Sequence, residues 1–95
     1  MAYKSVGYGQ ITSLSGAVTL ASVAGGIPRG AQSALIQAET QNIRWRDDGP
    51  APTSTVGMVL TAGDSLLYDF PLTVIKFIEV TASAKLNITF YGVDA

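Results

Sequence analysis

The feature of this sequence that most constrains its fold is a recurring alternation of apolar and polar residues with a period of two. In residues 42–46, Ile43 and Trp45 fall on one face of an extended chain, and the arginines between and after them fall on the other. Residues 65–70, with Leu66, Tyr68 and Phe70 on one face, and residues 85–91 repeat the pattern. This period is typical of half-buried β-strands. No stretch keeps the spacing of an amphipathic helix with caps, so the chain is predicted to be all-β.

Other segments supply the remaining strands. Residues 74–81 are apolar on both faces apart from Lys76 and Glu79, with Ile75 and Phe77 on one side, which indicates a central strand. We expect residues 81–84 to turn this strand into residues 85–91 as an antiparallel hairpin. Residues 33–39 are predicted as a strand leading into residues 41–47, and one or two weaker strands are expected around 11–14 and 17–21. With turn signals at 25–30, 47–53 and 62–64, the chain predicts a small antiparallel β-sandwich or a jelly-roll-like barrel of about seven to eight strands.

Length and composition predict one domain, spanning residues 1–95, with more apolar material than it can bury. Hydrophobic residues make up 47% of the chain and charged residues 14%, whereas charged residues average about 25% in soluble domains. We therefore expect part of the apolar surface to contact another subunit or a partner. Residues 1–9 are a candidate N-terminal arm, in which Tyr3 and Tyr8 are candidate interface residues.

Composition also excludes several classes of function. The net charge of −1 without a basic stripe argues against nucleic-acid binding. The absence of Cys and His removes zinc–thiolate sites, thiol nucleophiles and the commonest general base. No glycine-rich phosphate loop or nucleophile elbow is present. We expect no catalytic residues, metal or cofactor, hence no enzyme, and no membrane partner, because no segment predicts a bilayer span or a signal peptide.

The densest polar and aromatic group lies at residues 44–48. Asp47 and Asp48 fit either a cation site or a solvated turn. Trp45 with Arg44 and Arg46 fits three roles: a sugar- or anion-binding platform, an interface anchor, or a core tryptophan whose neighbouring arginines pair with the acidic residues. All five residues are candidates for an interface.

Residues 43–64, followed by 75–78 and 86–91, resemble small structural proteins of tailed bacteriophages, of the capsid decoration or cement type. The likeness covers residues 42–91. It rests on an aromatic strand with basic flanks, an Asp-Gly-x-x-Pro-Thr loop, a Gly-x-x-Leu-x-x-Gly turn, a Phe-Ile strand and a closing aromatic strand. The resemblance implies a β-sandwich or jelly-roll head that assembles on the virion as a symmetric oligomer.

Within this resemblance, the expected partner is the major capsid protein or another virion protein, bound by a homo-oligomer for which a trimer is favoured. The expected location is the virion, assembled in the host cytoplasm. Two alternatives stay open. One is a structural component of the neck, tail or fibre. The other is a carbohydrate-binding, receptor-contacting module in which Trp45 stacks on a sugar and Asp47 or Asp48 accepts its hydroxyl groups.

Overall fold

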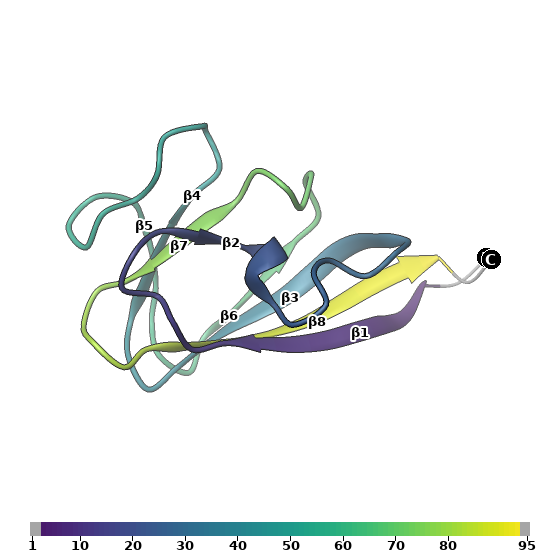
Figure 1. Cartoon of the computed structure of the whole chain (residues 1–95), viewed down its shortest axis with the longest axis horizontal. Coiled ribbons are helices and arrows are strands. Elements are labelled where there is room, and N and C mark those ends of the chain that lie inside the picture. The colour runs from purple at the N-terminus through teal and green to yellow at the C-terminus, as the bar shows by residue number, and fades with distance from the viewer. Residues whose placement is uncertain (1–2, 94–95) are drawn as a thin grey trace.

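The computed structural model describes residues 3–93, which fold into two antiparallel four-stranded sheets packed as a sandwich (Figure 1). The strands are β1 Tyr3–Ile11, β2 Val18–Thr19, β3 Ala31–Glu39, β4 Ile43–Arg46, β5 Met58–Leu60, β6 Ser65–Tyr68, β7 Lys76–Glu79 and β8 Lys85–Val93, with a 3₁₀ turn, η1 Leu20–Ser22, after β2. Sheet A has the strand order β1-β8-β3-β6, and sheet B has the order β2-β7-β4-β5. The all-β prediction is confirmed, and of the two predicted architectures the sandwich is the one observed.

The core lies between the sheets and is formed by alternate residues of their strands. On β8, Leu86, Ile88 and Phe90 face inward and are buried, as the alternation predicted. Phe77 on β7 of the other sheet, and Ile75 just before that strand, are also fully buried. Burying an aliphatic or aromatic side chain of this size contributes about 1.5–3 kcal/mol. Among the described residues the core contains no polar or charged side chain.

Three strands of sheet A, β1, β3 and β8, have nine residues each, whereas no strand of sheet B has more than four. The chain between β2 and β3 covers the inner side of sheet A at β1 (Figure 1). Gly7 and Gly9 make this covering possible. A Cβ atom on Gly7 would lie 2.6 Å from Pro28 Cγ, and one on Gly9 would lie 2.7 Å from Val23 Cβ. The two glycines therefore face the covering segment, and Tyr8 between them faces solvent.

The predicted hairpin of residues 74–81 and 85–91 is wrong. The first segment holds β7, which pairs with β2 and β4, whereas β8 pairs with β1 and β3. Residues 80–84 instead carry the chain from sheet B to sheet A. The physical reason is the core. Both segments have strongly apolar faces, and placing them in opposite sheets lets those faces pack against each other.

Three further expectations differ from the structure. The strand expected at residues 17–21 is reduced to the two residues of β2, followed by η1. The one expected at 11–14 contributes only Ile11, the last residue of β1. Phe70 lies beyond the end of β6 and is exposed, although its ring packs 5.7 Å from that of Tyr68.

Most of the candidate N-terminal arm is a strand of sheet A and not a free segment. Residues 3–9 belong to β1, an edge strand of sheet A that pairs with β8 along its length. Residues 1 and 2 lie outside the described part, as does the side chain of Tyr3. Deleting residues 1–9 would therefore remove most of an edge strand, so such a deletion cannot separate binding from folding.

Candidate functional site

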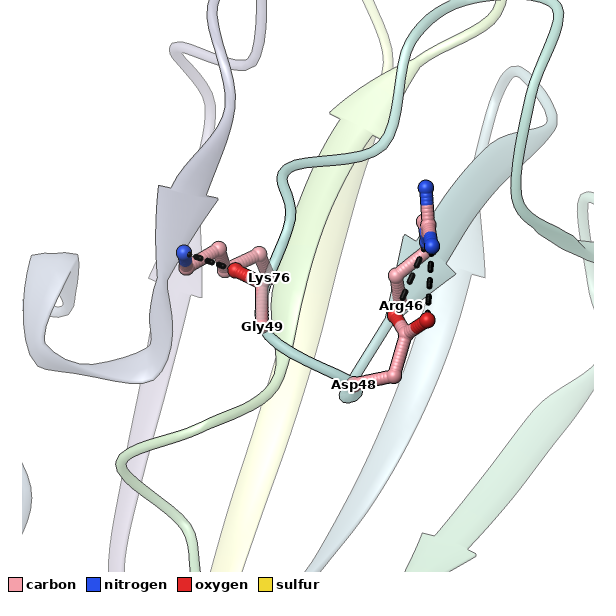
Figure 2. A network of polar contacts seen from close by, with 4 residues as sticks. All are labelled: Arg46, Asp48, Gly49 and Lys76. Atoms are coloured by element: carbon pink, nitrogen blue, oxygen red, sulfur yellow. Dashed lines mark hydrogen bonds and ion pairs between the residues drawn. The ribbon is translucent and has the colours of Figure 1, made fainter.

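The predicted cluster at residues 44–48 lies at the end of β4 and in the loop that follows it. Arg46 donates two hydrogen bonds to Asp48, from Nε to Oδ1 at 2.9 Å and from Nη2 to Oδ2 at 2.6 Å. Hydrogen bonding to Arg46 lowers the pKa of Asp48, and the same bonds raise the pKa of Arg46. On the neighbouring strand β7, Lys76 Nζ donates to the Gly49 carbonyl at 2.6 Å (Figure 2). These cations hold the start of the β4–β5 loop.

Arg44 holds the end of the same loop. Its Nη1 donates to the Gly57 carbonyl at 2.7 Å, and its Nε donates to the Ser54 carbonyl at 3.2 Å. Gly57 has a φ of 140°, a conformation that side-chain-bearing residues rarely adopt. Arg44 therefore stabilises a turn that only glycine forms easily.

Trp45 lies on the core side of sheet B. Its ring is partly buried and meets Tyr68 of sheet A edge to face, with centroids 6.4 Å apart. The Tyr68 hydroxyl donates to Asp47 Oδ2 at 2.9 Å. Burial, and then the bond to Asp47, raise the pKa of Tyr68 to about 12. Of the three roles considered, this geometry fits a core-side tryptophan flanked by arginines that bind their own chain. An interface role for residues 44–48 stays a prediction.

Asp47 and Asp48 do not form a cation site with other acidic groups. Each carboxylate accepts hydrogen bonds from a protein side chain, Tyr68 or Arg46. Within residues 3–93 no group of three or more His, Cys, Asp or Glu side chains could hold a metal ion. The two aspartates thus belong to a turn that the sandwich itself fixes.

A second polar cluster lies on the outer face of sheet A, where the strand register assembles it. Asn87 on β8 lies between Gln10 on β1 and Gln37 on β3, and Gln37 in turn pairs with Ser65 on β6. This row of uncharged polar side chains crosses all four strands. The next outward-facing row consists of Tyr8, Thr89, Leu35 and Leu67. We call the surface formed by these two rows, together with the adjoining Glu39, the amide face.

Asn87 is the centre of a hydrogen-bond network on the amide face. Its Oδ1 accepts from the Tyr8 hydroxyl at 2.8 Å and from Gln10 Nε2 at 3.0 Å. Its Nδ2 donates to Glu39 Oε1 at 2.7 Å and to Gln37 Oε1 at 3.4 Å. A primary amide has two donors and two acceptor positions, so Asn87 is fully used. Its four partners are held in place, and each keeps further hydrogen-bonding capacity.

The amide face is hollowed rather than flat. A shallow hollow of about 490 Å³ is lined by members of both rows and by Glu39. A second hollow of about 660 Å³ shares Leu35 with it and is lined also by Leu67 and Tyr91. Tyr8 stands beside the first hollow with 64% of its surface exposed. The two hollows therefore meet at Leu35 on the outer face of sheet A.

Large apolar side chains are also exposed on the other sheet. Val56, Met58 and Val59 lie on or next to β5, an edge strand of sheet B, with exposed fractions from 50% to 60%. We call these three residues the apolar edge. Phe70 and Val74 are exposed in the loop between β6 and β7. Both this loop and the β4–β5 loop project from the upper side of the molecule in Figure 1.

The structure separates the residues that the sequence singled out. Tyr8 lies on the amide face, whereas residues 44–48 lie on sheet B and in its adjoining loop. Gln10, Gln37 and Asn87 were missed as site residues. Their outward position in strands could have marked them as surface residues. These three residues are far apart in sequence, however, and only the pairing of β1, β8 and β3 brings them together.

Within residues 3–93 no helix has the length and apolar character needed to cross a membrane. Comparisons with protein-family models, with curated proteins and with solved structures find no match for this chain.

Proposed function

We propose that this chain is a non-enzymatic structural protein of a bacteriophage virion, a capsid decoration or cement protein that binds the capsid lattice as a symmetric oligomer. The observation that supports the proposal is the exposure of large apolar side chains, above all at the apolar edge. Exposed apolar clusters on small soluble domains are typical of contact surfaces. The resemblance of residues 42–91 to decoration proteins supplies the identity of the expected partner.

The apolar edge suits contact between subunits because it combines apolar side chains with an unpaired strand edge. Met58 and Val59 lie on β5, which pairs with β4 on one side only. No charged side chain lies within β5 itself, and charges or prolines are common means of protecting such an edge. A second chain can add to this edge by backbone hydrogen bonds and cover the apolar side chains at the same time.

The proposed mechanism is multivalent bridging. A small oligomer seated where capsid subunits meet contacts several neighbours, and all contacts form together only when the lattice has the correct spacing. Linked weak contacts can exceed the affinity of one contact by about a hundredfold or more. The oligomer would thereby resist the separation of capsid subunits under the pressure of packaged DNA.

Cosedimentation with expanded capsids of the phage that encodes the chain tests this proposal. We expect saturable binding at a fixed ratio to the major capsid protein. Met58→Glu, which places a charge on the apolar edge, should reduce binding strongly. Leu67→Glu is the matched control, because Leu67 is equally exposed but lies on sheet A.

Circular dichroism of both variants shows whether the fold is retained. Absence of binding by the unaltered protein would refute a capsid role. Loss of capsid binding in Leu67→Glu but not in Met58→Glu would refute the assignment of the subunit contact to the apolar edge.

A further inference from the structure

We infer that the amide face is a binding site for a neutral oligosaccharide. This inference is independent of the proposed virion function, because it concerns sheet A and not the apolar edge. It also differs from the carbohydrate site that the sequence suggested at Trp45. The Trp45 ring packs against Tyr68 and the core, and Asp47 and Asp48 already bind Tyr68 and Arg46.

The chemistry of the amide face matches a ligand rich in hydroxyl groups. Amide side chains offer both donors and acceptors, as sugar hydroxyls do. Within the described chain, the Gln10 carbonyl oxygen, the Gln37 amide nitrogen and Glu39 Oε2 have no hydrogen-bond partner. These three groups lie around one hollow and supply two acceptors and a pair of donors to a ligand.

Tyr8 adds an apolar surface at the edge of this hollow. Its ring is largely exposed, and its hydroxyl is held by Asn87 at 2.8 Å. The ring is thus fixed by a hydrogen bond at one end and by the strand at the other. A sugar ring can pack its C–H face on such an aromatic side chain while its hydroxyl groups form hydrogen bonds with the amides. Small-molecule sites typically combine apolar contacts with a few polar groups that fix the orientation of the ligand.

The network around Asn87 lowers the cost of binding. Ordering a free glutamine side chain on binding costs conformational entropy. Here Gln10 and Gln37 are already positioned by Asn87, and all three side chains stand on paired strands rather than on loops. Preorganised groups of this kind lose less entropy when the ligand arrives.

The charge of the face argues for a neutral ligand. Glu39 is the one charged group that lines the hollow among the described residues, and it disfavours anions. Four strands span about 14 Å between the outer two, which suits a short oligosaccharide. A protein partner would instead have to cover a central row of amides, whereas the centres of protein interfaces are typically apolar.

A ¹⁵N-edited NMR titration with maltotriose, cellotriose and chitotriose tests the inference on the full chain. We expect at least one of these trisaccharides to shift the side-chain amide signals of Gln10, Gln37 and Asn87, with a dissociation constant on the order of 1 mM. Tyr8→Ala and Gln37→Ala should each weaken binding about tenfold. The matched control Gln41→Ala, on a glutamine that does not line the hollow, should bind as the unaltered protein does.

Several results would overturn the inference. One is the absence of any shift at the amide face with all three sugars. Another is binding that Tyr8→Ala and Gln37→Ala, with folded spectra, leave unchanged. A third is a shift of the same signals with protein concentration alone, which would show that a second copy of the chain covers the face.

Discussion

The outer faces of the two sheets use their polar side chains in opposite ways. On sheet B, Arg44, Arg46 and Lys76 donate to groups of the β4–β5 loop, so their hydrogen bonds hold the chain's own fold. On sheet A, Gln10 and Gln37 bond sideways to Asn87 and keep polar atoms toward solvent. The cluster that is dense in the sequence thus stabilises the structure, and the cluster that is dispersed in the sequence remains open to a ligand.

Among the variants that compare the two sheets, Arg44→Ala is expected to lower the free energy of unfolding most. The variant loses hydrogen bonds to two loop carbonyls, of which the one to Gly57 is partly buried. At about 0.5–1.5 kcal/mol for each bond, we expect the free energy of unfolding to fall by about 1–2 kcal/mol. Urea denaturation measures this change.

The matched variant on sheet A is Gln37→Ala. Gln37 is exposed and makes one long hydrogen bond, at 3.4 Å, so its loss should change the free energy of unfolding by no more than about 0.5 kcal/mol. An equal decrease in the free energy of unfolding in Arg44→Ala and Gln37→Ala would show that the polar side chains of the two sheets contribute equally to stability.

A smaller effect is expected from Tyr68→Phe, which removes the hydrogen bond between a sheet A tyrosine and Asp47 at the end of β4. We expect a loss of about 1 kcal/mol near neutral pH. The pH dependence is more specific. The folded protein raises the pKa of Tyr68 to about 12, above the ordinary value of about 10. The stabilisation is complete below about pH 10 and is lost as the pH rises toward 12.

The difference in denaturation midpoint between Tyr68→Phe and the unaltered protein should therefore shrink between pH 10 and 12. Subtracting the two curves removes the titration of groups that both proteins share. A constant difference across this range would contradict the role given to the Tyr68–Asp47 bond.

The smallest effect is expected from Asp48→Asn. Asp48 is exposed and Arg46 half-buried, and ion pairs at the surface contribute little to stability. The denaturation midpoint should stay within experimental error. The sign of the pH effect is still defined, because Arg46 lowers the pKa of Asp48. The pair's contribution is present above the ordinary carboxyl pKa and is lost as the pH falls through the lowered one.

NMR titration of the Asp48 carboxyl group checks this point directly. Its pKa should be lower in the unaltered protein than in Arg46→Gln. Identical pKa values in the two proteins would exclude the ion pair in solution.

Strands β4, β6 and β8 could be predicted from the sequence because alternation is a local signal, whereas β1 and β5 were not expected as strands. Ile43 and Trp45 face the core and Leu86, Ile88 and Phe90 are buried, as their spacing required. Strand partners are not local. The pairing of β7 with β4, and of β8 with β1 and β3, depends on which apolar faces meet across the core. A short turn at residues 81–84 therefore predicted a hairpin that the sandwich does not form.

The same distinction applies to the candidate sites. Arg46 and Asp48 are two residues apart, so their proximity could be predicted. Gln10, Gln37 and Asn87 come from strands whose order only the tertiary structure defines. Tyr8 was expected to belong to an N-terminal arm. It instead lies on the amide face, because β1 pairs with β8 along its length.

We propose that the exposed apolar edge is a contact between subunits of a symmetric oligomer. Light scattering of the purified protein at low and high salt measures its native mass directly. We predict the mass of an oligomer, with a trimer favoured, that persists at high salt because apolar contacts are not screened by ions, and a monomer for Met58→Glu. A monomer at every protein concentration and salt condition would contradict the claim.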